Sequence, residues 1–357
     1  MTVRPKRQRK DTMESNGSEP PSDDDDDPEM EIDILNIEVS TLDDLILVAK
    51  DVTKQMNAKM RSRKRYKKNK HSLCFQLKEI TKDLVELQKL VGLSELKNQI
   101  AMQIVFLIQG LGTDELMHTA IMGPPGMAKT TVSNILAKIY GKLGFLSKGH
   151  VTVAKRSDLI GQYLGETSIK TTKLLTACKG GVLLIDEAYQ LGDGGRSSGD
   201  SYSAECLNAI NQFLSENSRD FMCIIAGYKE QIDKCFFGSN PGLDRRFPWK
   251  FTTESYNMKE LCSVFQYQLK ETGWTCEDSD LAGFIDDNMD LFKNNGGDTL
   301  TLFDKCKMSY AQRTFTMKKG SFKVKHIISR DLNNAIRLLK SLKNIEHLDK
   351  SWQHMYL

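Results

Sequence analysis

The sequence predicts an α/β fold with a parallel sheet at its centre, followed by a smaller helical region. Two observations indicate this fold: short apolar runs alternate with helical stretches, and a glycine-rich loop follows the first run. The apolar runs lie at 119–122, 151–154, 182–185 and 221–226, and the helical stretches lie at 130–140, 167–178 and 202–214. Buried parallel strands joined by crossover helices produce this alternation. After Tyr256 the runs largely stop, so the remainder is expected to be mostly helical.

The residues before the sheet differ in charge and periodicity. Residues 1–30 are rich in Pro, Ser, Asp and Lys, a composition typical of a disordered segment. Leu42–Met60 has the apolar spacing of an amphipathic helix, and the basic block Arg61–Lys70 follows it. From Leu73 the pattern is helical again, with Ser94 expected to cap a helix. The predicted parts are a disordered or partly helical charged extension at 1–72, an α/β domain with leading helices at 73–255, and a helical domain with a C-terminal tail at 256–357.

Composition narrows the class of protein. The chain has 357 residues, 39% of them hydrophobic and 27% charged, and a net charge of only +3, so no global basic field indicates nucleic acid or membrane. Its eight cysteines include no CxxC pair, which argues against a zinc site or a disulfide framework. No apolar run approaches the ~20 residues of a membrane span. We expect a soluble intracellular protein without a membrane partner. The cytoplasm is favoured, with nuclear import through the basic block as the alternative.

A phosphate-binding loop is predicted between the first strand and its helix. Residues 123–131 read Gly-Pro-Pro-Gly-Met-Ala-Lys-Thr-Thr. Backbone N–H groups of such a loop converge on a triphosphate, and Lys129 would reach the β- and γ-phosphates of ATP. Thr130 would offer its hydroxyl to Mg²⁺. The predicted nucleotide-binding residues of the loop are Gly123, Pro124, Pro125, Gly126, Met127, Ala128, Lys129, Thr130 and Thr131.

One residue of this loop departs from the usual GxxxxGK[ST] pattern. Ala128 stands where the pattern has glycine. A positive φ at this position would cost alanine about 1 kcal/mol, whereas a near-helical backbone would cost it nothing. We expect the near-helical backbone, because the loop is turning into a helix at this point.

Two carboxylates follow the apolar run at 182–185. Asp186 and Glu187 would lie at the carboxyl edge of the sheet, where ligands of open α/β sheets bind. Asp186 is expected to hold Mg²⁺ through water. Glu187 is expected to act as the general base toward the attacking water. The pair turns a predicted ATP-binding site into a predicted ATP-hydrolysing site.

Ordered motifs over roughly residues 80–255 resemble those of the AAA+ ATPases. Within that family they resemble the CbxX/CfqX-type branch, which includes red-type Rubisco activase and the stage V sporulation protein K group. The matching stretches are 90–93, 123–131, 158–165, 180–189, 225–229 and 239–247. The resemblance implies a P-loop core with a five-stranded parallel sheet and a small α-helical lid. The lid region matches more loosely, and residues 1–72 do not match.

The resemblance also implies roles for residues outside the loop. Val91 and Gly92 would line the adenine pocket, and Tyr163 would lie on a loop facing a central pore. An aromatic side chain there offers flat contacts for a threaded polypeptide. Arg246 would be the arginine finger, acting on the γ-phosphate of the next subunit. The expected active unit is therefore a homo-hexamer that remodels a protein client.

Some positions leave alternatives open. Gly227 and Tyr228 stand where many AAA+ proteins have a polar residue that orients the water. Gly296–Thr299 replaces the expected lid arginine, and Arg313 is an alternative only by proximity in sequence. The alternatives to client remodelling are a nucleic-acid motor or loader using the basic N-terminal blocks, or a slow ATP-dependent scaffold.

Overall fold

The computed structural model describes residues 32–61, 72–111, 115–163, 165–192, 201–217, 219–277, 281–318 and 320–353. The predicted disorder of residues 1–30 and most of the basic block Arg61–Lys70 lie outside these ranges.

A five-stranded parallel sheet in the order β2-β3-β4-β1-β5 forms the centre of the fold. Its strands are β1 (Thr119–Met122), β2 (Val151–Ala154), β3 (Val182–Ile185), β4 (Met222–Gly227) and β5 (Trp249–Thr252). The four strands predicted from apolar runs are confirmed, with β4 shifted by one residue. The apolar pattern does not reveal β5, because this edge strand carries an exposed lysine, Lys250.

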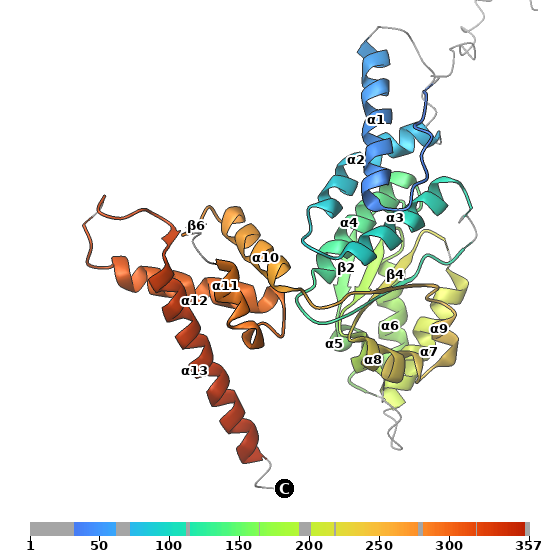
Figure 1. The fold of residues 1–357 in the computed structure, drawn as a ribbon. Helices are drawn as coiled ribbons and strands as arrows, with labels where there is room; N and C mark the ends of the chain where they lie inside the picture. The colour runs from blue at the N-terminus through green and yellow to red at the C-terminus, as the bar shows by residue number, and fades with distance from the viewer. Residues whose placement is uncertain are drawn as a thin grey trace, which may run out of the picture.

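Helices cover both faces of the sheet (Figure 1). Alternate strand residues enter two apolar clusters: Ile121 and Leu184 face one side, whereas Met122 and Ile185 face the other. The first side is covered by α4 (Lys129–Leu143) and the helices before the sheet. The other side is covered by α5 (Arg156–Leu159), α6 (Glu166–Ala177), α7 (Ser201–Glu216), the short turns η1 (Ala188–Leu191) and α9 (Pro241–Asp244), and the π-helix η2 (Ile232–Phe237). The short turn α8 (Lys229–Gln231) connects β4 to η2 and has no buried residue.

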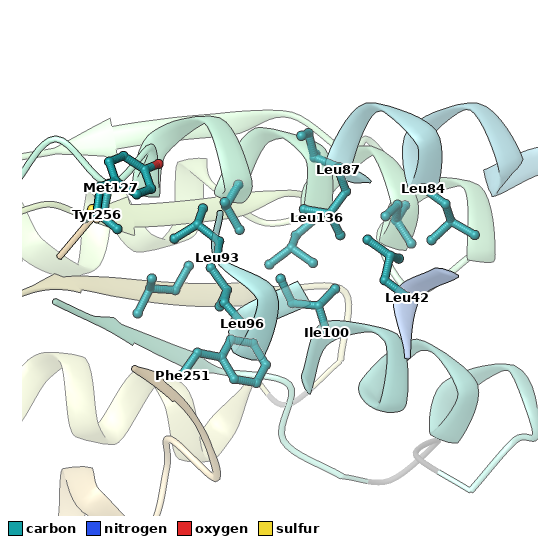
Figure 2. Packing of buried hydrophobic residues seen from close by; sticks show 14 of the residues in the cluster. Leu42, Leu84, Leu87, Leu93, Leu96, Ile100, Met127, Leu136, Phe251 and Tyr256 are labelled. Atoms are coloured by element: carbon teal, nitrogen blue, oxygen red, sulfur yellow. The ribbon is translucent and has the colours of Figure 1, made fainter. Parts of the chain in front are cut away.

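Three helices precede the sheet: α1 (Leu42–Arg61), α2 (Leu73–Gln88) and α3 (Ser94–Ile108). The amphipathic helix predicted at Leu42–Met60 is therefore confirmed. Its apolar face is buried in the same cluster as α2 and α3, and Figure 2 shows Leu42 beside Leu84 and Ile100. The predicted boundary at residue 72 thus runs between helices that share a core, and this packing favours assigning α1 to the α/β domain.

The predicted cap of α3 is wrong. The helix begins at Ser94 itself, and Leu93 occupies the N-cap position with a left-handed backbone, at φ 58°. Gly92 before it also has a positive φ, of 61°. These two left-handed residues let the chain reverse sharply between α2 and α3. The same turn forms part of the functional site described below.

A helical lid follows the sheet and lies beside it in Figure 1. Its helices are α10 (Met258–Glu271), α11 (Leu281–Asp286), η3 (Met289–Leu291), α12 (Gly296–Thr314) and α13 (Ser329–Gln353), with a two-stranded parallel pair of β6 (Thr275–Cys276) and β7 (His326–Ile327). Asn257 and Glu260 form a capping box at the start of α10. Among the described residues, no helix has the length and apolarity needed to cross a membrane.

Candidate functional site

The predicted phosphate loop connects β1 to α4 at the carboxyl edge of the sheet. The N–H of Gly123 donates to the carbonyl of Gly227 at 2.9 Å, so the loop starts as a continuation of the β1–β4 ladder. A Cβ atom on Gly123 would lie 1.9 Å from Thr253 Oγ1, which explains the glycine. Gly126 has φ 75° and is exposed. The loop therefore presents its backbone between the central strand and the first turn of a helix.

The expectation for Ala128 is wrong. Its backbone is left-handed, at φ 53° and ψ 25°, and it forms the N-cap of α4 without a side-chain cap. Its carbonyl accepts the N–H of Val132 at 2.9 Å, so it still starts the helix. The residue that joins the loop to the helix thus has the backbone conformation that glycine prefers. An alanine in this conformation carries a steric strain of about 1 kcal/mol.

Lys129 is the first residue of α4 and lies near both predicted acids, Asp186 and Glu187. Its Nζ donates to the carbonyls of Gly123 and Pro124, at 3.2 and 2.9 Å. Burial lowers the pKa of Lys129, and the charges of Asp186 and Glu187 partly oppose that change. The side chain therefore lies within electrostatic range of the two carboxylates that follow β3. The next two residues of the helix, Thr130 and Thr131, are exposed.

The chain changes direction between Asp186 and Glu187, just after β3. Glu187 has a left-handed backbone, at φ 54°, and its N–H donates to Asp186 Oδ1 at 3.1 Å. Burial raises the pKa of the Glu187 carboxyl, the charge of Asp186 raises it further, and Lys129 lowers it. A carboxylate with a raised pKa beside a second acid is a suitable proton acceptor.

These residues fit ATP and Mg²⁺ by their chemistry. Loop amides, the N-terminus of α4 and the ammonium of Lys129 suit a polyphosphate. The hydroxyl of Thr130 and the carboxylate of Asp186 are oxygen ligands of the kind Mg²⁺ prefers. The loop and the acids are brought together by the parallel order of β1, β4 and β3.

The turn at Val91 and Gly92 lies against the start of the lid. A Cβ atom on Gly92 would lie 2.5 Å from Glu260 Oε1 and 3.1 Å from Tyr256 Cε1. Tyr256 is buried, and Figure 2 shows it beside Met127 of the loop. Sequence reasoning did not identify Tyr256 and Glu260 as neighbours of the site, although the Asn-x-x-Glu capping pattern marks the start of α10. The turn, the loop and the lid thus meet at the site.

Tyr163 and Arg246 lie on other parts of the domain. Tyr163 follows α5 and is 68% exposed, and its N–H donates to Glu166 Oε2 at 3.2 Å. Arg246 follows α9, and its Nε donates to Ser215 Oγ at 2.8 Å. Arg246 is therefore anchored to the end of α7, whereas Tyr163 projects from its loop into solvent.

The alternative assignment of Arg313 as the lid arginine near the phosphates is wrong. Its guanidinium forms an ion pair with the buried carboxylate of Asp331 at 2.8 Å and also donates to the carbonyl of His326. Gly296, at the start of α12, contacts the phosphate loop through Gly126. Arg313 lies 17 residues further along the helix, or about 25 Å. Arg313 therefore stabilises the lid and does not face the phosphate loop.

The position after β4 carries an aromatic pair. Tyr228 is the N-cap of α8, and its ring centroid lies 6.0 Å from that of Tyr189. Tyr189 also packs over Gly227, where a Cβ atom would lie 2.9 Å from Tyr189 Cδ1. The ring of Tyr189 explains why the strand ends in glycine here.

Comparisons with known proteins agree with this architecture. The sequence model of the family described as "ATPase family associated with various cellular activities (AAA)" matches residues 119–238. A putative cfxQ-like protein of Acanthamoeba polyphaga mimivirus is 35% identical over 284 residues, which cover 78% of this chain and 69% of that protein. The chloroplastic ribulose bisphosphate carboxylase/oxygenase activase of Cyanidioschyzon merolae is 36% identical, over 55% of this chain and 68% of its own.

Solved structures support the fold. A Thermotoga maritima RuvB mutant superposes with a TM-score of 0.52 at 16% identity, covering 71% of this chain and 72% of its own. The phosphate loop, the two acids after β3 and the helical lid occur here in one chain, and the cfxQ-like relative matches 78% of its length. The chain therefore belongs to the CbxX/CfxQ branch of the AAA ATPases.

Proposed function

We propose that this AAA ATPase hydrolyses ATP with Mg²⁺ at the loop 123–131 and uses the energy to remodel a protein client. The observation that carries the proposal is the placement of Lys129 within range of both Asp186 and Glu187. The nucleotide phosphates would lie between the loop amides and Lys129, with Thr130 and Asp186 toward the metal. Mg²⁺ supplies charge neutralisation at the phosphates when bound.

Glu187 is the proposed base. Its carboxylate would accept a proton from the attacking water, which a raised pKa favours. Lys129 would compensate the charge that develops on the phosphate oxygens. The left-handed backbone of Glu187 turns it away from the path of β3, so the two acids can serve separate roles.

Arg246 is proposed to act on the site of the neighbouring subunit. It is held at the end of α7 by Ser215, and a finger supplied in trans requires an oligomer. A hexameric ring is the assembly that the branch suggests. In such a ring Tyr163, which is exposed at its loop tip, would face the client.

The client is proposed to be a protein. A relative's name states that it activates ribulose bisphosphate carboxylase/oxygenase, which is a protein substrate of that relative. We place the activity of this chain in the cytoplasm, with the nucleus as the alternative, and the client in the same compartment.

A paired set of variants tests the function. Glu187→Gln should retain ATP and lose turnover, whereas Tyr163→Ala should retain basal ATPase and lose work on the client. Capture of bound protein on the Glu187→Gln variant in native lysate, followed by ATPase stimulation with each captured protein, identifies the client. Equal phosphate release from Glu187→Gln and wild type would refute the base assignment. Stimulation by DNA or RNA in place of protein would favour the nucleic-acid motor.

A further inference from the structure

The residue before α12 has an unusual backbone, and its side-chain amide both donates and accepts a hydrogen bond. Asn295 is 1% exposed, with φ 50° and ψ −121°. Its Oδ1 accepts the N–H of Tyr256 at 2.9 Å, and its Nδ2 donates to the carbonyl of Pro125 at 3.2 Å. One amide thus bonds to two segments that are far apart in the sequence.

The two segments are the phosphate loop and the linker to the lid. Pro125 is the third residue of the loop, and Tyr256 lies between β5 and α10, where the chain leaves the sheet. The backbones around these bonds are also in close contact. A Cβ atom on Gly126 would lie 2.1 Å from the carbonyl oxygen of Asn294, and one on Gly296 would lie 2.8 Å from the carbonyl oxygen of Gly126.

The chemistry at this position requires an amide. The carbonyl of Pro125 needs a donor, and the N–H of Tyr256 needs an acceptor. Asparagine supplies both from one short side chain. A backbone in this sparsely populated region persists only where surrounding contacts hold it, and here they do so at the loop that binds the phosphates.

We propose that Asn295 is a positioning residue that couples the orientation of the lid to the conformation of the phosphate loop. The coupling slows the release of nucleoside diphosphate, because the loop and the linker cannot move apart without breaking the bonds of one side chain. This inference rests on the proposed nucleotide site at 123–131.

The lid contains a matched control residue. Asn288 is also a buried asparagine, 7% exposed, and its Nδ2 donates to the carbonyl of Phe284 within the lid at 2.8 Å. Asparagine to aspartate removes the donated bond at either site and preserves side-chain shape. At Asn295 the change also leaves the acceptor for Tyr256 in place.

The test measures dissociation of a fluorescent ADP from the full chain by stopped flow. Asn295→Asp should release it at least about five-fold faster than wild type, because the change removes the donated bond and places a carboxylate oxygen against the carbonyl of Pro125. Asn288→Asp should stay within about two-fold of wild type even where its melting temperature falls similarly. Hydrogen exchange of 123–128 should accelerate in the first variant only.

Asn295→Gly provides a second test if the aspartate variant does not fold. It relieves the positive φ but removes both side-chain bonds, so it should also release ADP faster. Release from both Asn295 variants at the wild-type rate would overturn the inference while leaving the nucleotide site intact. Failure of the wild-type chain to bind the fluorescent ADP would overturn the site itself, and the inference with it.

Discussion

The Nε of Arg246 lies 2.8 Å from the hydroxyl oxygen of Ser215, which in turn donates to the carbonyl of Asn211 at 2.8 Å. The guanidinium is therefore held by the last turns of α7 through its Nε. The proposed role of Arg246 toward a neighbouring subunit would use the other nitrogens of the guanidinium.

Arg246→Ala should bind ATP normally and lose most of its turnover in the assembled state. Glu187→Gln should also be inactive, but it keeps its arginine. Mixing the two inactive variants in equal amounts should restore turnover at roughly a quarter of the sites, since each such site pairs an intact Glu187 with a neighbour's Arg246. Phosphate release that stays at the level of the separate variants, in demonstrably mixed oligomers, would refute action in trans.

Ala128→Gly should stabilise the protein. The native backbone at this position is left-handed, so glycine removes a strain of about 1 kcal/mol, partly offset by the greater freedom of the unfolded chain. We expect a net gain of about 0.5 kcal/mol in the free energy of unfolding, measured by urea denaturation. The control is Ala58→Gly, at an exposed position of α1 with helical backbone, which should lose about 1 kcal/mol. If both variants lost the same amount of unfolding free energy, the backbone strain at Ala128 would be contradicted.

As the pH is lowered, the rate of hydrolysis should begin to fall while the pH is still above 4.5, the ordinary pKa of a glutamate carboxyl. Glu187 must be ionised to accept a proton, and burial together with Asp186 raises its pKa above that ordinary value. Activity is therefore fully present well above the raised pKa and is lost as the pH falls through it. The measurement is kcat/KM for ATP at saturating Mg²⁺ as a function of pH, because this ratio reports the ionisation of the free enzyme. Circular dichroism confirms that the chain stays folded, and a kcat/KM that does not change down to pH 4.5 would show that Glu187 is not the base.

His118 should make the fold sensitive to acid. It is fully buried, its Nδ1 accepts the N–H of Cys223 at 3.1 Å, and burial lowers its pKa to about 4. Because the unfolded chain binds this proton near pH 6.5 and the folded chain does not, stability is fully present above pH 6.5. It declines by up to about 3 kcal/mol as the pH falls to 4.

Urea denaturation between pH 4 and pH 6.5 measures this decline. His118→Asn, which keeps an acceptor near Nδ1, should flatten the slope of stability against pH, whatever its effect on absolute stability. An unchanged slope in the His118 variant would refute the burial of a neutral imidazole.

The sequence was sufficient to predict the elements that depend on local pattern. The strands at 119–122, 151–154 and 182–185 and the helix of α1 follow from apolar spacing, and each is where the pattern puts it. The number of strands in the sheet and the lid came from the family resemblance. The order of the strands was not predicted, because it depends on contacts between residues far apart in the chain. The edge strand β5 was not found because Phe251 is its only fully buried residue and Lys250 is exposed, so it has no continuous apolar run.

The details of the site were harder to predict because they are set by tertiary contact. The backbone of Ala128 was expected to follow helix propensity, but the loop reaches α4 through a left-handed residue. Asn295 gave no signal of its own, since only the folded lid brings it to Pro125. Arg313 was considered by its sequence position, whereas the length of α12 takes it away from the loop to Asp331.

The packing of α1 has a mechanical consequence. The N–H of Leu42 donates to Asn98 of α3 at 3.1 Å, and the helix lies along α2. These two helices flank the turn at Gly92, which touches Tyr256 and Glu260 at the nucleotide site. A displacement of α1 would therefore move α2 or α3, and with them the turn that contacts Tyr256 and Glu260.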